Sequence, residues 1–182
     1  MAEKKLKANS AELITQFATL SDYLTPACKV LDLACGSGRT GQWFTDRNCQ
    51  VSYLDKDLTG LDIALPDKTT VIERLEWNLE DGSAPPLPQA HYDIILVFNY
   101  LHRPLLNQII DSIKPGGLII YETFTEQQAQ IGRPRNPDFL LKAGELKAIF
   151  ANWSCLHYSE DLFGELLNAS YKAQIIAQKP LG

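Results

Sequence analysis

Three glycines near residue 40 have the spacing of a nucleotide-binding turn. Gly36, Gly38 and Gly41 spell G-x-G-x-x-G within L-D-L-A-C-G-S-G-R-T-G, residues 31–41. Glycine is needed where the backbone takes unusual dihedral angles and a ligand approaches it closely. The pattern follows a predicted strand and opens a predicted helix, which is the context that such a ligand site requires. The spacing alone leaves the identity of the ligand open.

An acidic residue before this turn favours a cationic ligand. Asp32 lies four residues before Gly36, inside the end of the predicted strand. A carboxylate there points at the turn amides or at an amino group of the ligand, and it would repel the pyrophosphate that NAD presents at this place. S-adenosylmethionine (SAM) is positively charged at its sulfur and its amino group. We therefore expect SAM, with an NAD-dependent oxidoreductase as the alternative.

Residues after the next strands complete the expected cofactor site. Asp55 ends the second predicted strand about 20 residues beyond the turn, which suits a carboxylate that accepts both ribose hydroxyls. Asn78 and Leu79 follow the third strand, where the Asn78 amide oxygen can accept from a ligand or start a turn. The expected cofactor residues are Asp32, Ala34, Cys35, Gly36, Gly38, Arg39, Asp55, Lys56, Asn78, Leu79, Phe98 and Asn99.

Reactive side chains also follow the fourth predicted strand. We expect catalytic roles for Tyr100, His102 and Arg103, with His102 as a general base because an unperturbed imidazole titrates near neutral pH. A histidine that begins a helix by bonding a backbone group is an equal alternative. A reaction for which positioning of the reactants suffices needs no base.

Three residues on and after the fifth predicted strand are expected to bind the acceptor. Glu122 can orient an acceptor or pair with an arginine. Arg133 and Arg135 lie in G-R-P-R-N-P, and arginine forks suit a carboxylate or an oxyanion. A solvated surface loop is the alternative. This loop, about 15 residues without predicted secondary structure, has the length of a lid.

Apolar runs alternating with amphipathic stretches predict the elements that hold these residues. The predicted strands are residues 28–34, 49–54, 70–75, 92–98, 118–124, 153–158 and 169–177, and the predicted helices are residues 11–24, 40–47, 57–65, 105–113 and 143–150. Residues 80–91 contain three prolines and are predicted as a loop, and residues 115–117 as a turn.

Nearly continuous apolar strands separated by helices indicate a parallel sheet that is covered on both faces. The last two strands are too close in sequence for a helical crossover, so we expect them to pair antiparallel. The predicted fold class is α/β: a Rossmann-like, mostly parallel seven-stranded sheet with helices on both faces and a C-terminal antiparallel hairpin.

Length and composition predict one domain over residues 1–182, in which residues 1–27 form a helical segment packed on the core. A net charge of −5 with scattered Lys and Arg disfavours a nucleic-acid partner. The four cysteines have no ligand-like spacing with the histidines, so no metal site is expected. With no secretory apolar region and no membrane-length apolar run, we expect a cytoplasmic monomer or homodimer with no membrane contact.

Beyond the glycine turn, the chain resembles the tellurite-resistance branch of the class I SAM-dependent methyltransferases. The matching pieces are L-D-L-A-C-G-S-G-R, Y-D-I-I-L, K-P-G-G and L-K-A-G-E-L-K-A-I-F-A-N-W. Ala34 stands where the family signature has its first glycine, and Asn78 where the family often has an aspartate. The resemblance implies that Asn78 accepts from the adenine amine, with Leu79 against the adenine face. The resemblance implies methyl transfer from SAM to a small-molecule acceptor that is anionic or a soft nucleophile, such as a metalloid oxyanion. A non-catalytic SAM-binding regulatory protein and an RNA methyltransferase are the alternatives.

Overall fold

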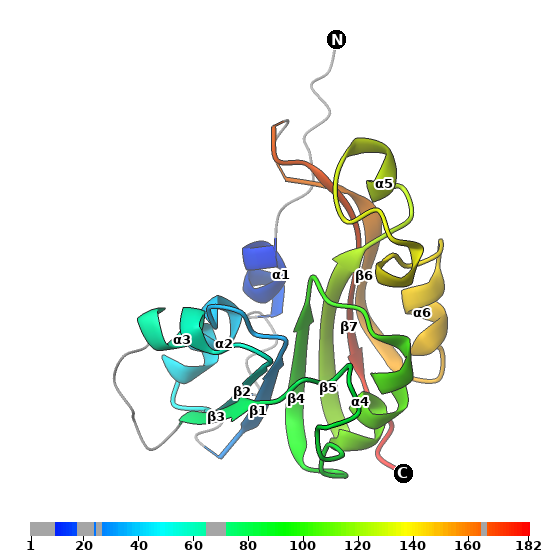
Figure 1. Cartoon of the computed structure of the whole chain (residues 1–182). Helices are drawn as coiled ribbons and strands as arrows, with labels where there is room; N and C mark the ends of the chain where they lie inside the picture. The colour runs from blue at the N-terminus through cyan, green and yellow to red at the C-terminus, as the bar shows by residue number, and fades with distance from the viewer. Residues whose placement is uncertain (1–9, 18–23, 25–26, 65–71, 165–166) are drawn as a thin grey trace.

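A seven-stranded sheet runs through the part of the chain that the computed structural model describes, namely residues 10–17, 24, 27–64, 72–164 and 167–182. The strands lie in the order β3-β2-β1-β4-β5-β7-β6 (Figure 1). Strands β1 to β5 pair in parallel, whereas β7 lies antiparallel between β5 and β6. The predicted fold class is confirmed. The strand bounds are β1 Lys29–Leu33, β2 Gln50–Asp55, β3 Ile72–Glu76, β4 Tyr92–Phe98, β5 Ile113–Phe124, β6 Ser154–Phe163 and β7 Ser170–Gln178.

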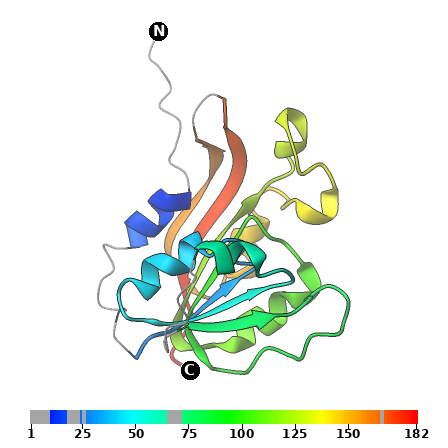
Figure 2. The same ribbon diagram turned by 60° about the vertical axis from the view of Figure 1, so that its left-hand side comes forward.

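Helices cover both faces of the sheet (Figures 1 and 2). One face carries α1 Ser10–Phe17, α2 Arg39–Thr45 and α3 Thr59–Ala64, and the other carries α4 Leu106–Ser112 and α6 Glu145–Ile149. The short helices η2 Arg103–Leu105, α5 Gln128–Ile131 and η3 Pro137–Phe139 follow the carboxyl ends of β4 and β5. Within the described ranges, no helix is long and apolar enough to cross a membrane.

The two faces of β1 show how the core fixes the strand that carries the glycine turn. Successive side chains of a strand point to opposite faces. Leu31 packs in the cluster that includes Ile109 of α4, and Val30 packs in the cluster that includes Phe17 of α1 and Phe44 of α2. Leu31 and Val30 are fully buried. Because β1 is packed on both faces, its carboxyl end holds the turn at a fixed position.

The start of β5 differs from the prediction. The strand begins at Ile113, so the predicted turn at residues 115–117 lies inside it. The pairing with β4 shifts from Tyr92↔Ile113 to Ile94↔Leu118. The extra residues of β5 interrupt the pairing without ending the strand, and Gly116 among them has a positive φ of 76°.

Residues 125–144, which we call the 125–144 segment, also differ from the prediction. The loop expected there to lack secondary structure contains α5, η3 and a bridge between Thr125 and Leu141. Asn136 starts η3 by accepting a hydrogen bond from the Asp138 N–H at 3.1 Å, with a proline at the first helical position.

Other boundaries moved by a few residues. Strand β6 continues to Phe163, five residues past its predicted end, because its pairing with β7 runs on to Phe163↔Ser170. Helix α6 is shorter than predicted and begins at Glu145. The predicted helix over residues 11–24 and the predicted strand over residues 70–75 lie partly outside the described residues.

Candidate cofactor and acceptor site

The turn after β1 is shaped by residues in the left-handed conformation. Ala34, Gly36 and Gly38 have φ angles of 55°, 54° and 71°. The Gly38 N–H closes the turn by donating to the Cys35 carbonyl at 2.8 Å. A Cβ built on Gly36 would meet no atom within 4 Å. The backbone at Gly36 is therefore open to the approach of a ligand.

The other two glycines of the turn are required by packing. A Cβ on Gly41 would lie 2.5 Å from Tyr53 Cε1 and 2.7 Å from Asp32 Oδ2, and a Cβ on Gly38 would collide with Leu61 and Tyr53. Tyr53 is fully buried beneath the turn. The G-x-G-x-x-G spacing thus has two causes: backbone exposure at the first glycine and close helix–strand packing at the others.

Asp32 is buried beneath the turn. It is 3% exposed, and its Oδ2 accepts a hydrogen bond from the Gly41 N–H at 2.8 Å. The carboxylate thereby faces the first turn of α2, where negative charge is favourable. The pKa of Asp32 is raised to about 7, mainly by burial; the Gly41 N–H acts to lower it and the nearby Asp55 carboxylate to raise it. We expected Asp32 to point either at the amides of the turn or at an amino group of the ligand. In the structure it bonds an amide, the Gly41 N–H.

Asp55 joins the end of β2 to the same turn. Its Oδ2 accepts from the Gly36 N–H at 2.8 Å, and its Oδ1 accepts from the Asp57 N–H at 3.3 Å. Asp57 in turn accepts from the Thr59 N–H at 2.9 Å, where α3 begins. Asp55 therefore fixes the exposed glycine, while Asp57 bonds the first residue of α3.

A cavity of about 230 Å³ lies at the carboxyl ends of β1, β2, β3 and β4. Five predicted cofactor residues line it together with four others; the full lining is Ala34, Leu54, Asp55, Lys56, Trp77, Asn78, Leu79, Glu80 and Tyr100. Residues from four separate strand ends thus meet at one cavity. Trp77 and Glu80 were not predicted at this site, although they flank Asn78 and Leu79 directly.

Asn78 serves a turn as well as the cavity. Its Oδ1 accepts from the Glu80 N–H at 3.0 Å, which is the alternative that the sequence left open. Trp77 next to it is anchored by its own N–H, which donates to the Asp55 carbonyl at 3.0 Å. The cavity wall after β3 is therefore tied to the end of β2.

The end of β4 carries Phe98, Asn99 and Tyr100. Phe98 is half-buried, and Asn99 is exposed with a φ of 55°, a conformation that asparagine tolerates better than most residues. The Asn99 N–H donates to the Glu122 carbonyl at 2.8 Å, and the Tyr121 hydroxyl donates to the Tyr100 carbonyl at 3.0 Å. Burial and the Glu80 carboxylate raise the pKa of Tyr100.

Arg103 is engaged with protein groups on all sides of its guanidinium. Its Nε and Nη2 donate to the two carboxylate oxygens of Glu145 at 2.7 and 2.9 Å. Its Nη1 and Nη2 also donate to the carbonyls of Asp138 and Leu140 at 3.0 and 2.8 Å. His102 is half-buried at the start of η2, where its carbonyl accepts from the Leu105 N–H at 3.0 Å.

Glu122 lies within the sheet. It is fully buried and accepts from Lys172 Nζ and Gln174 Nε2, both at 2.6 Å. The ion pair that the structure describes for Glu122 is with a lysine of β7, whereas an arginine was one of the two expected partners. This carboxylate balances the charge of Lys172 inside the β5–β7 pair.

Arg133 and Arg135 are both exposed at the end of α5. The buried Gln128 side chain fixes the backbone there, since its Nε2 donates to the Arg133 carbonyl at 2.9 Å while its Oε1 accepts from the Tyr171 N–H at 2.8 Å. Gln128 thus ties the arginine-bearing turn to β7.

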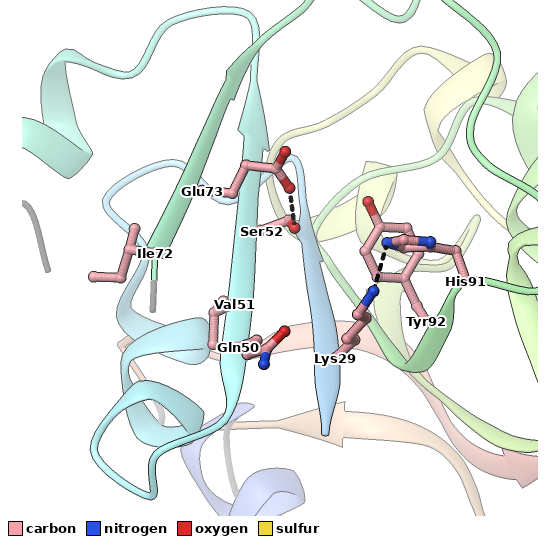
Figure 3. A pocket seen from close by; sticks show the side chains of 8 residues that line it. All are labelled: Lys29, Gln50, Val51, Ser52, Ile72, Glu73, His91 and Tyr92. Carbon is pink, nitrogen blue, oxygen red and sulfur yellow. Dashed lines mark hydrogen bonds between the residues drawn. The ribbon is translucent and has the colours of Figure 1, made fainter. Parts of the chain in front are cut away.

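A second, larger cavity of about 550 Å³ lies at the opposite edge, beside the amino ends of β1, β2 and β4 (Figure 3). Its polar groups contact one another. Ser52 donates to Glu73 at 2.6 Å, and Lys29 Nζ lies 3.5 Å from His91 Nε2. Ligands of open α/β sheets bind beyond the carboxyl ends of the strands. We therefore place the functional site at the smaller cavity.

Comparison with known proteins defines the family. The family model described as "Tellurite resistance protein TehB" matches residues 6–179. The chain belongs to the TehB family. A curated relative from Haemophilus influenzae, strain Rd, named "Probable S-adenosyl-L-methionine-dependent methyltransferase TehB", is 33% identical over 155 residues, covering 76% of this chain and 50% of the relative. The predicted resemblance is confirmed, and the chain spans about half the length of the curated relatives it matches.

Solved structures share the fold of this TehB-family chain. The crystal structure of TehB from Haemophilus influenzae superposes with a TM-score of 0.71 at 20% identity, covering 94% of this chain and 62% of that one. A 1,6-didemethyltoxoflavin-N1-methyltransferase from Burkholderia thailandensis, solved with S-adenosylhomocysteine bound, gives 0.66 at 15% identity and covers 94% and 80%. At these identities the likeness concerns the fold.

Proposed function

We propose that this chain is a SAM-dependent methyltransferase that acts on a small-molecule acceptor. The observation that carries the proposal is the cavity at the strand carboxyl ends, where Asp55 both bonds the exposed Gly36 turn and lines the wall with Asn78 and Leu79. Membership of the TehB family and the name of its curated relative support it.

The residues of the site fit SAM. A cavity of about 230 Å³ is smaller than the roughly 300 Å³ at which whole small-molecule sites begin, so we assign the adenosine half to it. Asp55 accepts hydrogen bonds from the ribose hydroxyls. Asn78 bonds the edge of the adenine ring, which lies between Leu79 and Ala34. The open backbone at Gly36 leaves room for the rest of the cofactor to pass along the turn, toward Cys35, Gly38 and Arg39.

The carboxylates suit the charge of this cofactor. SAM supplies an activated methyl group on a positively charged sulfur. Asp32 and Asp55 place negative charge under and beside the turn, and a pyrophosphate there would be repelled. An NAD-dependent enzyme is therefore the weaker candidate.

The acceptor side is assigned from position. Tyr100 lines the cavity, and Phe98, Asn99 and His102 lie next to it in sequence. His102 is the side chain we propose for proton transfer where the acceptor needs it. Arg133 and Arg135 are the groups we propose for an anionic acceptor, because both are exposed on a turn that Gln128 holds rigid. Arg103 and Glu122, which we expected at this site, have protein partners instead, so we assign neither to the acceptor.

A screen for methyl transfer tests the proposal. Purified protein is incubated with tritiated SAM and fractions of a metabolite extract, with Asp55→Ala as the matched inactive variant. Transfer of tritium into a small molecule by the wild type alone supports the proposal. Binding of SAM without transfer to any fraction favours a non-catalytic regulatory role, and salt-sensitive retention of tRNA or rRNA favours an RNA methyltransferase.

The acceptor turn has its own test. Replacing Arg133 and Arg135 together by alanine should weaken use of an anionic acceptor while S-adenosylhomocysteine affinity stays unchanged. Equal loss of both would move these arginines to the cofactor side. A cytoplasmic location and a monomeric or homodimeric state stay predictions, checked by fractionation and by light scattering.

A further inference from the structure

We infer that Arg103 is a positioning residue that couples the 125–144 segment to the cofactor cavity, an inference that rests on the proposed function. The guanidinium is the point where the loop after β4 meets this segment. Four hydrogen bonds of 2.7 to 3.0 Å connect it to Glu145, Asp138 and Leu140. These partners lie 35 to 42 residues away in sequence, so the contact joins separate parts of the chain.

The near end of this connection is the cavity wall. Tyr100 lines the cavity, three residues before Arg103. The loop between them is held from beneath by β5, since Tyr121 donates to the Tyr100 carbonyl and the Glu122 carbonyl accepts from the Asn99 N–H. A ligand that packs against Tyr100 will therefore restrain the loop that carries Arg103.

The far end is the second half of the 125–144 segment. The first half is fixed to β7 by Gln128. In the second half, the Leu141 backbone bonds Phe124 and Glu126 and its side chain is fully buried, while Arg103 holds the carbonyls of Asp138 and Leu140. Glu145 extends the connection, because its Oε2 also accepts from the Lys142 N–H at 2.8 Å. The Lys142 amide hydrogen is thus bonded to a carboxylate that Arg103 holds. Figure 2 shows the backbone of this segment, coloured yellow-green to yellow, extending beyond the end of β5.

The geometry of the Arg103 contact indicates that it sets the orientation of the 125–144 segment and contributes little to the stability of the fold. The Arg103 and Glu145 side chains are 35% and 21% exposed, and ion pairs of that exposure add little stability. Planar, two-pronged pairing with additional backbone acceptors sets an orientation, which a lysine cannot reproduce. The pair raises the pKa of Arg103 and lowers that of Glu145, so both stay charged across the neutral range.

The coupling is measured by amide hydrogen exchange with and without saturating S-adenosylhomocysteine. In the wild type, binding should slow exchange at Lys142 and its neighbours by at least about threefold, since stabilising one end of a coupled pair stabilises the other. Arg103→Gln and Arg103→Lys should both abolish this slowing while still binding the ligand. Arg47→Gln is the control, because Arg47 stacks on Trp43 away from the cavity.

The outcomes separate this inference from the proposed function. Binding of S-adenosylhomocysteine by the wild type without slower exchange at residues 138–145 overturns the coupling alone. The same conclusion follows if either Arg103 variant keeps the wild-type response. Failure of the wild type to bind S-adenosylhomocysteine overturns the proposed function and the coupling together.

Discussion

Replacing Asp32 by asparagine should make the ligand-free protein more stable at alkaline pH. Asp32 is 3% exposed, and burial raises its pKa from 3.8 to about 7. At 1.36 kcal/mol for each pKa unit, the ionised carboxylate costs about 4 kcal/mol of folding free energy. Asparagine keeps an oxygen for the Gly41 N–H but introduces an amide NH₂, which costs about 2 kcal/mol if unpaired. The free energy of unfolding at pH 8 should therefore rise by about 2 kcal/mol.

The sign of the pH dependence follows from the same shift. Because the folded pKa lies above the unfolded one, the contribution of Asp32 to stability is complete below pH 3.8 and is lost as pH rises through about 7. Between these values the folded state holds one more proton, which gives a slope of up to about 1.4 kcal/mol per pH unit. The difference between wild type and Asp32→Asn isolates this slope from other titrating groups.

Urea unfolding at half-unit steps from pH 4 to 9 measures the difference, with the exposed Asp111→Asn as control. Two outcomes would show that burial does not raise the pKa of Asp32. One is that the free energy of unfolding of wild type and Asp32→Asn depends on pH in the same way; the other is that the variant is less stable at pH 8. A stability gain accompanied by weaker binding of S-adenosylhomocysteine would identify a carboxylate that is kept for function at the expense of the fold.

Two further substitutions test the surroundings of the site. Ala34→Gly should raise the free energy of unfolding by about 0.5 kcal/mol, because relief of the positive φ of 55° exceeds the entropy cost of glycine; a loss in urea unfolding would contradict it. Lys172→Met should lower stability by about 3 kcal/mol by leaving Glu122 charged and buried. The double variant Lys172→Met with Glu122→Gln should recover most of that loss, and an additive loss would show that the pair is not coupled.

The sheet and the glycine turn could be predicted from the sequence, because both depend on patterns within short stretches of the chain. Continuous apolar runs mark the parallel strands, and the short spacing between the last two strands indicates their antiparallel pairing. The glycine turn combines with Asp55 at a distance of 19 residues, which is a recurrent spacing.

The remainder depends on contacts that no local pattern contains. Arg103 meets Glu145 across 42 residues, and Glu122 meets Lys172 across 50. In the sequence, Arg103 and Glu122 resemble functional groups that are available beside a site. Their partners can be identified only from the folded structure. The 125–144 segment was predicted as a loop for the same reason, since Gln128 and Arg103 fix it through residues of β7 and of the β4 loop.

Equilibrium binding of SAM by the wild type and by Asp55→Ala tests the central claim most directly. Asp55 bonds the Gly36 N–H and lines the cavity, so its loss removes charge-assisted hydrogen bonds worth about 1.5–3 kcal/mol each. Titration calorimetry should show SAM binding to the wild type and binding at least about tenfold weaker to Asp55→Ala, with no binding of NAD to either. Binding of NAD but not SAM by the wild type would contradict the account.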